Sequence, residues 1–138
     1  MHLVRLIQGG FMQTQTNSSS QSILKDISPA LQICIQNCLD CYQICTRTID
    51  QCLTKGGQHS EAKHIKLLQD CADICNLSAK FMLRGSEFHS STCGVCSEVC
   101  LACAKSCEAM KDSDEQMKAC AEACQKCAAS CQSMSKMQ

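Results

Sequence analysis

The sequence has few of the residues that build loops, aromatic clusters or an ordinary apolar core. Its 138 residues include one proline, six glycines, three phenylalanines, one tyrosine and no tryptophan. Ile, Leu, Val and Phe together number 26, about 19% of the chain. A fraction this low indicates disorder only when net charge is high, and here 13 basic residues balance 13 acidic ones. Without a basic excess or stacking aromatics, we expect no nucleic acid and no membrane surface as partner.

Long hydrophobic runs are also missing. No stretch reaches the roughly 18 apolar residues of a membrane span, and the apolar segment within residues 1–12 is too short and interrupted for a secretory signal. A disulfide scaffold would need more glycine and proline for its loops. We therefore expect a cytoplasmic protein with reduced thiols, a setting in which dense cysteines are more often metal ligands than disulfides.

Cysteine is what the sequence has in abundance. Sixteen of the 138 residues are cysteine, roughly 12%, which is above the level that defines a cysteine-rich class. Because the other apolar side chains are too few to fill an interior, we expect the cysteines themselves to form the core.

The cysteines divide the chain into two regions. Residues 1–27 contain none and include a polar Ser/Thr/Gln/Asn tract at 14–22, so we expect a partly disordered or loosely docked arm there. All sixteen lie in residues 28–138, which we expect to be a single cysteine-rich domain.

Helix start and stop signals divide residues 28–138 into four segments. Ser28-Pro29 is a cap followed by a first-turn proline, Gly56-Gly57 and Gly85 are stops, and Ser60, Ser86 and a Ser113/Gln116 capping box are further starts. Long helices with short connections favour an all-α, antiparallel up-down-up-down four-helix bundle. The predicted helices are 28–55, 60–85, 86–111 and 113–135.

The cysteines recur almost entirely at steps of three or four. At about 100° per residue, the cysteines of the first, third and fourth helices each lie within an arc of about 60–80°. Such a stripe must face the interior of a bundle, so the spacing predicts a core lined by sulfur. The predicted metal ligands are Cys34, Cys38, Cys41, Cys45, Cys52, Cys71, Cys75, Cys93, Cys96, Cys100, Cys103, Cys107, Cys120, Cys124, Cys127 and Cys131.

Charge favours one metal over the others for such a core. A Zn²⁺ with four thiolates carries about −2, and several stacked in a dry bundle would bury charge without cationic partners. Cu(I) is soft and monovalent, and replacing each S–H proton by one Cu⁺ leaves the core neutral. Cysteines on one helix point the same way, so disulfides would have to form between helices. The ferredoxin-type cysteine run is absent.

Two alternatives stay open beside the binding of Cu(I). A zinc- or cadmium-buffering protein of metallothionein type would also use many thiols. A thiol oxidoreductase is less favoured because no single cysteine pair lies beside an activating group. No Ser-His-Asp, phosphate-loop or paired-carboxylate pattern is present, so we expect no enzyme.

The spacing resembles that of the cysteine-lined four-helix-bundle copper storage proteins, specifically their cytosolic branch. The resemblance covers about residues 30–135 and is carried by Cys34-x₃-Cys38-x₂-Cys41-x₃-Cys45, Cys71-x₃-Cys75, Cys93-x₂-Cys96-x₃-Cys100-x₂-Cys103-x₃-Cys107 and Cys120-x₃-Cys124-x₂-Cys127-x₃-Cys131. It implies reversible binding of multiple Cu(I) ions per chain, no catalysis and a homotetramer. Thr48, His64 and Met117 stand where such stripes often carry another cysteine. Neither the copper donor nor the acceptor is specified.

One end of the predicted bundle brings imidazole and thioether groups together with thiols. The end of the first and third helices and the start of the second and fourth share it, bringing together Cys52, His59, His64, Cys107, Met110, Met117 and Cys120. We predict that His64 and Met117 are metal ligands at a copper entrance, binding more weakly than thiolate; Met as core filler is the competing interpretation. At the opposite end we expect an apolar plug formed by Phe81, Met82, Phe88 and Met134.

Overall fold

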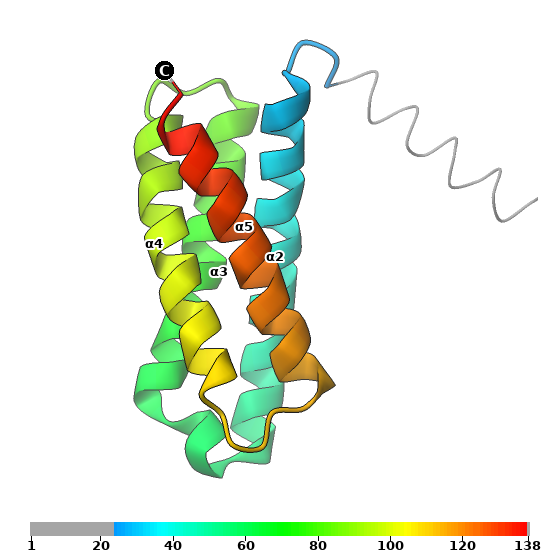
Figure 1. The fold of residues 1–138 in the computed structure, drawn as a ribbon, viewed down its shortest axis with the longest axis vertical. Coiled ribbons are helices and arrows are strands. Elements are labelled where there is room, and N and C mark those ends of the chain that lie inside the picture. Colours follow the sequence, from blue (N-terminus) through cyan, green and yellow to red (C-terminus); the bar gives the residue numbers. More distant parts are fainter. Residues whose placement is uncertain (1–23, 138) are drawn as a thin grey trace, which may run out of the picture. The chain divides into compact units, whose positions relative to one another are not determined.

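The computed structural model describes residues 24–137. In that range it contains helices and no strand, as the all-α prediction requires. The predicted helix boundaries agree with the observed ones to within a few residues. The elements in chain order are α2 (Pro29–Lys55), the 3₁₀ turn η1 (Gly57–Ser60), α3 (Ala62–Leu83), α4 (His89–Glu108) and α5 (Glu115–Ser135) (Figure 1).

The chain divides into two units after Gln32. In the first, the Ser28 hydroxyl accepts a hydrogen bond from the Leu31 amide at 3.3 Å, which confirms Ser28 as the cap of α2. The Gln32 side chain donates to the carbonyls of Leu24 and Ile27 at 3.0 and 2.7 Å. The predicted arm, residues 1–27, lies outside the described residues except for its last four.

The predicted glycine stops are confirmed. α2 ends one residue before Gly56, which has φ 76°, and Gly85 after α3 has φ 66°. Both angles lie in the left-handed region that side chains with a Cβ avoid. After Gly85 the Ser86 amide donates to the Phe81 carbonyl at 2.9 Å, the bond that closes a glycine-terminated helix.

The predicted starts of α3 and α4 are wrong by two or three residues. The Ser60 hydroxyl donates to the Gly57 carbonyl instead of capping α3, and α3 begins only at Ala62. The Ser86 hydroxyl accepts from the Phe88 amide, so the chain makes another turn before α4. A serine bonds to its own local backbone as readily in a turn as in a helix cap, and sequence alone does not separate the two.

The predicted Ser113/Gln116 capping box is also wrong. Asp114 caps α5, because its Oδ1 accepts from the Met117 amide at 2.9 Å. The Gln116 amide donates instead to the Thr48 hydroxyl of α2 at 2.8 Å. The Gln116 side chain therefore joins α5 to α2 and does not form the predicted capping box.

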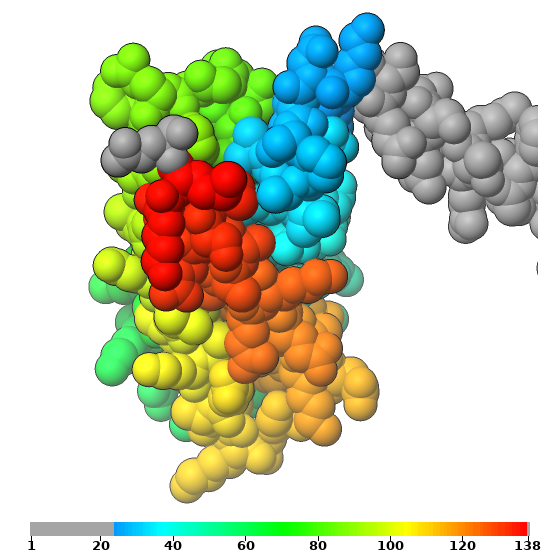
Figure 2. Space-filling model, turned by 45° about the horizontal axis from the view of Figure 1, so that its top comes forward, coloured from blue at the N-terminus to red at the C-terminus, as the bar shows by residue number. Residues whose placement is uncertain are grey.

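Residues 33–137 form an antiparallel bundle of up-down-up-down topology, as predicted. Successive helices run in opposite directions (Figure 1), and sulfur contacts join α2 to α3, α2 to α5 and α3 to α4. Figure 2 shows α5 lying against α4 and α2. None of the helices in residues 24–137 is both long and apolar enough to cross a membrane.

The interior of the bundle consists of sulfur and small side chains. Each of the sixteen cysteines has a relative exposure of 1% or less, and alanines together with Leu68 fill the space between them. Met82 and Met134 are buried at the end predicted to be an apolar plug. Phe88 is 59% exposed, so it is not part of that plug: α4 starts after it and its ring stays outside the bundle.

Candidate metal centre

The cysteine stripes of the four helices meet along the bundle axis. Steps of three and four keep successive thiols on one helix face, and burial of that face brings Sγ atoms from different helices to 3.4–4.0 Å of one another. A disulfide bond is about 2.05 Å long, so these are contacts between free thiols, and all sixteen are unpaired. Within residues 24–137 every cysteine is a free thiol.

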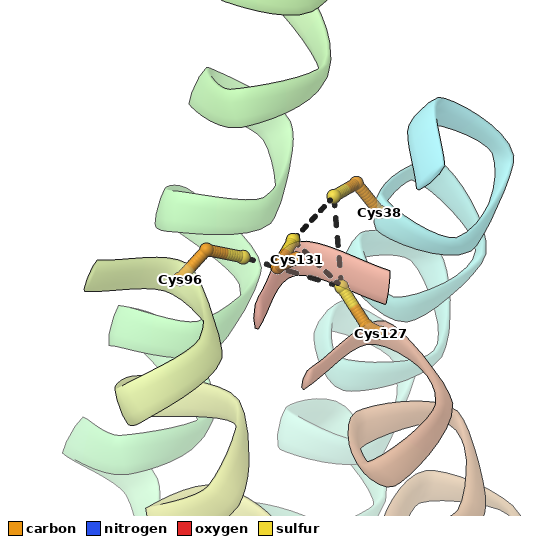
Figure 3. A group of neighbouring side chains, drawn as sticks. All are labelled: Cys38, Cys96, Cys127 and Cys131. Atoms are coloured by element: carbon orange, nitrogen blue, oxygen red, sulfur yellow. Dashed lines mark hydrogen bonds between the residues drawn. The ribbon is translucent and has the colours of Figure 1, made fainter. Parts of the chain in front are cut away.

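The thiols form groups of four whose Sγ atoms all lie within 4.8 Å of one another. One group joins Cys38 of α2, Cys96 of α4 and Cys127 and Cys131 of α5 (Figure 3). Further groups are Cys41/Cys71/Cys75/Cys100, Cys41/Cys45/Cys71/Cys124, Cys45/Cys103/Cys120/Cys124 and Cys75/Cys96/Cys100/Cys127.

Neighbouring groups share members, so the thiols form a continuous array. Cys41 and Cys75, for example, each belong to two groups. Metal ions bound in such an array would share bridging thiolates, which soft monovalent ions accept. A set of separate tetrahedral zinc sites would require each group to keep its own four ligands.

The core contains no compensating positive charge. Every lysine and arginine in residues 24–137 is exposed. Burial raises the pKa of the Cys52 thiol to about 11, so this thiol carries its proton at neutral pH. A monovalent cation that replaces the proton leaves the charge of the core unchanged, whereas divalent ions with four thiolates each would not.

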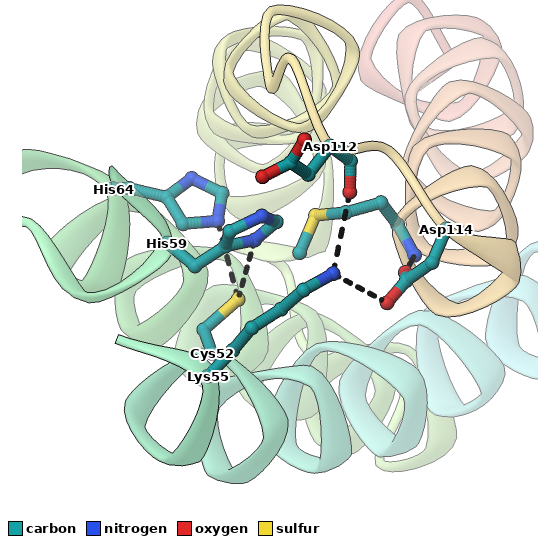
Figure 4. A network of polar contacts seen from close by, with 7 residues as sticks. Cys52, Lys55, His59, His64, Asp112 and Asp114 are labelled. Atoms are coloured by element: carbon teal, nitrogen blue, oxygen red, sulfur yellow. Dashed lines mark hydrogen bonds and ion pairs between the residues drawn. The ribbon is translucent and has the colours of Figure 1, made fainter. Parts of the chain in front are cut away.

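The mouth, which we define as Cys52, His59, His64 and Met117, has a different donor set. Figure 4 shows the Cys52 thiol beside the imidazoles of His59 and His64. The Cys52 Sγ lies 3.5 Å from His64 Nε2 and 4.0 Å from His59 Nδ1. Met117 is 2% exposed and lines a small cavity together with Cys52 and His59. The two residues predicted as entrance ligands, His64 and Met117, thus lie at the same end of the bundle as Cys52.

His64 is held in place by a bond on its other ring nitrogen. Its Nδ1 lies 2.7 Å from the Ser106 hydroxyl of α4, which leaves Nε2 directed at Cys52. Burial lowers the pKa of His64, so the imidazole is neutral at neutral pH and its Nε2 lone pair is available to a metal.

An ion pair lies beside the mouth. The Lys55 Nζ lies 3.0 Å from Asp114 Oδ2 and donates to the Asp112 carbonyl at 3.3 Å (Figure 4). It ties the end of α2 to the connection before α5. Both side chains are more than one-third exposed, so the pair contributes about 0–1 kcal/mol and does not seal the mouth rigidly.

The remaining residues predicted at this end take different positions. Cys107 and Cys120 are fully buried, and Cys120 belongs to a four-thiol group. Met110 is 8% exposed and lines a groove between α3 and α4 with His64. Thr48 is fully buried, and its hydroxyl donates to the Ile44 carbonyl at 2.7 Å, so it interrupts the sulfur stripe of α2.

His59 is not among the ligands that the sequence pattern predicts. Its ring is buried against Cys52 because Gly56 and Gly57 turn the chain into η1, which folds back over the end of α2. The only signal in the sequence is a histidine shortly after a double glycine, which is equally typical of an exposed loop.

Comparison with known proteins identifies the family of the chain. A family model described as copper storage protein matches residues 28–136. The chain belongs to the copper storage protein family. It is accordingly a storage protein and not an enzyme, and the predicted resemblance is confirmed.

Solved structures of similar proteins share the fold. A protein of Nitrosospira multiformis is 44% identical, with a TM-score of 0.74 over 79% of this chain and 97% of that one. The Cu(I)-bound copper storage protein BsCsp3 of Bacillus subtilis is 37% identical, with a TM-score of 0.71 over 77% and 98%. A cytosolic copper storage protein of Streptomyces lividans with five coppers is 32% identical, with a TM-score of 0.68 over 79% and 94%.

Another relative matches over a shorter part of its length. The uncharacterized cysteine-rich protein YhjQ of Bacillus subtilis (strain 168) is 38% identical over 68 residues, which are 49% of this chain and 63% of that protein.

Proposed function

We propose that this copper storage protein holds several Cu(I) ions through the thiolates of its sixteen core cysteines. The observation that carries the proposal is the continuous array of four-thiol groups that share members. Each Cu⁺ replaces one thiol proton, so many ions fit without a build-up of charge, and capacity is about one ion per cysteine. The Cu(I) bound by the Bacillus subtilis relative supports this choice of metal.

We also propose that copper enters and leaves at the mouth. His64 and Met117 are metal ligands there, together with Cys52. A neutral imidazole and a thioether bind Cu(I) less tightly than a thiolate, so an ion held by them passes readily to the thiols deeper in the core. The cavity lined by Cys52, His59 and Met117 supports this route.

Three further features belong to the same proposal. The protein acts in the cytoplasm, where its thiols stay reduced, as the cytosolic relative from Streptomyces lividans suggests. It assembles as a homotetramer, an expectation that rests on the family resemblance alone. Residues 1–27 form an arm outside the storage domain, residues 28–138, and the family match that begins at residue 28 supports this boundary.

An anaerobic titration tests the storage function. Reduced apo-protein is titrated with Cu(I) against a competing chelator, and thiol content and bound copper are measured on the same sample. We expect uptake to continue to about one copper per cysteine. A plateau at only a few ions per chain, or tighter binding of Zn²⁺ than of Cu(I) under matched free-metal conditions, would contradict storage of copper.

The rates of uptake and release test the mouth. In the His64→Ala/Met117→Ala variant we expect slower exchange with a chelator, while the capacity of the thiol core changes by no more than about one ion. Met134→Ala, at the opposite end of the bundle, is the matched control and leaves both rates unchanged. Unchanged rates in the double variant would exclude this entrance.

A further inference from the structure

The mouth combines two imidazoles with a single thiol, unlike the thiol groups of the interior. His64 and Cys52 come from α3 and α2, and His59 comes from the turn η1 between them. The sulfur lies 3.5 Å from one imidazole nitrogen and 4.0 Å from the other. Imidazole is a borderline donor that suits zinc-class divalent ions as well as copper.

His59 has an unsatisfied nitrogen at this point. Its side chain is buried, with the residue 4% exposed, and its Nε2 has no hydrogen-bond partner within residues 24–137. The adjoining cavity of about 30 Å³ has room for about one water molecule. Buried polar atoms are normally paired, so the orphaned Nε2 of a residue that lines this cavity indicates a bound water there, while Nδ1 is the ring nitrogen that lies toward Cys52.

We propose that Cys52, His59 and His64 form a site for one divalent ion of the zinc class. With a Zn–S bond of about 2.3 Å and a Zn–N bond of about 2.0–2.1 Å, tetrahedral angles place sulfur and nitrogen about 3.6 Å apart. The observed separations of 3.5 and 4.0 Å need only small side-chain movements to reach this. A water molecule completes four-fold coordination.

The rest of the mouth suits this ion. The Ser106 hydroxyl lies 2.7 Å from His64 Nδ1, and in the tautomer with the proton on Nδ1 it accepts a hydrogen bond that keeps Nε2 free for the metal, as second ligand shells do in zinc sites. One thiolate and one divalent ion leave a charge of about +1, and the Lys55–Asp114 ion pair that lines the cavity beside Cys52 and His59 adds no net charge to it. Four thiolates around such an ion in the dry core would instead carry about −2.

This site has a consequence for copper that rests on the proposed function. A divalent ion bound by Cys52 and His64 occupies two of the donors that Cu(I) meets on entry. One equivalent of Zn²⁺ therefore slows the uptake of Cu(I) by the wild-type chain, and the effect disappears when His59 is replaced.

Cobalt(II) in place of zinc tests the site in the reduced apo-protein of full length, because its absorption spectrum reports ligands directly. We expect one tight Co²⁺ per chain, with charge-transfer intensity of a single thiolate that is lost in Cys52→Ser. His59→Gln and His64→Gln weaken binding by more than about tenfold, and Ser106→Ala, which keeps all three ligands, by about tenfold. His89→Gln, a histidine bonded to the Ser86 carbonyl at the other end, leaves binding unchanged.

Two results would overturn the proposal. One is unweakened Co²⁺ binding in the His59→Gln/His64→Gln double variant, checked for native helix content. The other is an intensity of several thiolates that persists in Cys52→Ser, which would place the ion in the core. Failure of the Cu(I) titration would overturn the storage proposal alone, because the cobalt measurement contains no copper.

Discussion

At the scale of single residues, the position of Thr48 shows how the storage array is limited. Thr48 is fully buried on the cysteine stripe of α2, between Cys45 and Cys52. Its hydroxyl donates to the Ile44 carbonyl and accepts from the Gln116 amide. A hydroxyl is a hard donor that Cu(I) does not favour, so the array has a gap at this level.

Replacing Thr48 by cysteine is expected to fill that gap. Thr48→Cys should raise the copper capacity by about one ion per chain, with a cost of about 1 kcal/mol in unfolding free energy for the lost hydrogen bonds. Bound copper that survives competition with a chelator is measured. Thr46→Cys, on the exposed face of the same helix, is the control and should add a thiol without adding protected copper. An equal gain in copper capacity in both variants would contradict binding in a buried thiol array.

At the scale of elements, the helix ends depend on a few residues whose roles differ. Gly85 ends α3 at φ 66°, where a Cβ is strained. Gly94 lies inside α4, and a Cβ added there would sit 3.7 Å from the Ser135 Cβ, an ordinary contact. Asp114 caps α5 and pairs with Lys55. These positions allow matched tests of what holds the bundle together.

The two glycines are expected to respond in opposite directions to alanine. Gly85→Ala should lower the unfolding free energy by about 1 kcal/mol because of the left-handed backbone. Gly94→Ala should raise it by about 0.5–1 kcal/mol because alanine is the better helix former. Urea unfolding of the reduced apo-protein measures both. Stabilisation by Gly85→Ala would contradict the assigned end of α3.

Asp114 is expected to make stability depend on pH in the acid range. The hydrogen bond from the Met117 amide, and then the Lys55 contact, lower its pKa below 3.8. Its contribution is therefore complete above that ordinary value and is lost as the pH falls through the lower, folded-state pKa. Asp114→Ala should cost about 1 kcal/mol at pH 7.

Asp114→Asn separates the cap from the charge. Asparagine caps a helix about as well as aspartate, so this variant should keep most of the stability at pH 7. It should also lose the part of the acid dependence that comes from residue 114. Thermal unfolding followed from pH 7 to about pH 3 measures both. Identical pH profiles for Asp114→Asn and the wild type would show that the carboxylate has no such role.

At the scale of the whole molecule, copper and protons compete for the same sulfur atoms. The thiols form one buried network without cationic partners. Burial raises the pKa of Cys52 to about 11, so the Cys52 thiol is protonated at neutral pH. Filling the array therefore exchanges protons for Cu⁺ at constant charge. The bound Cu⁺ ions also join the helices, because each ion is shared between thiolates of different helices. Such ions bind the folded state and not the unfolded chain, so they stabilise the fold.

Copper loading is expected to release about one proton per thiol that becomes a ligand. Titration of the reduced protein with Cu(I) in weak buffer at pH 7, followed by a pH indicator, measures the ratio directly. The melting temperature should rise with each addition, because the ions stabilise the folded state. Loading without proton release would mean that the thiols were already ionised in the apo-protein.

The sequence by itself determined the class of this protein. Cysteines at steps of three and four, such as Cys93, Cys96 and Cys100, leave only an inward stripe on a helix, because the helical period is a local property of the backbone. The glycine stops at Gly56 and Gly85 were equally readable, since left-handed backbone angles exclude most other residues. Four helices lined with sulfur followed from these patterns, and charge favoured copper over zinc as the metal.

Only the tertiary structure decided which groups of different helices meet. Gln116 bonds to Thr48 and not to its own cap, and η1 places His59 on Cys52, because packing in three dimensions outcompetes local alternatives of similar energy. A histidine after two glycines has no periodicity from which a partner can be predicted. The cysteine core was therefore predictable from the chain, whereas the arrangement of the mouth required the fold.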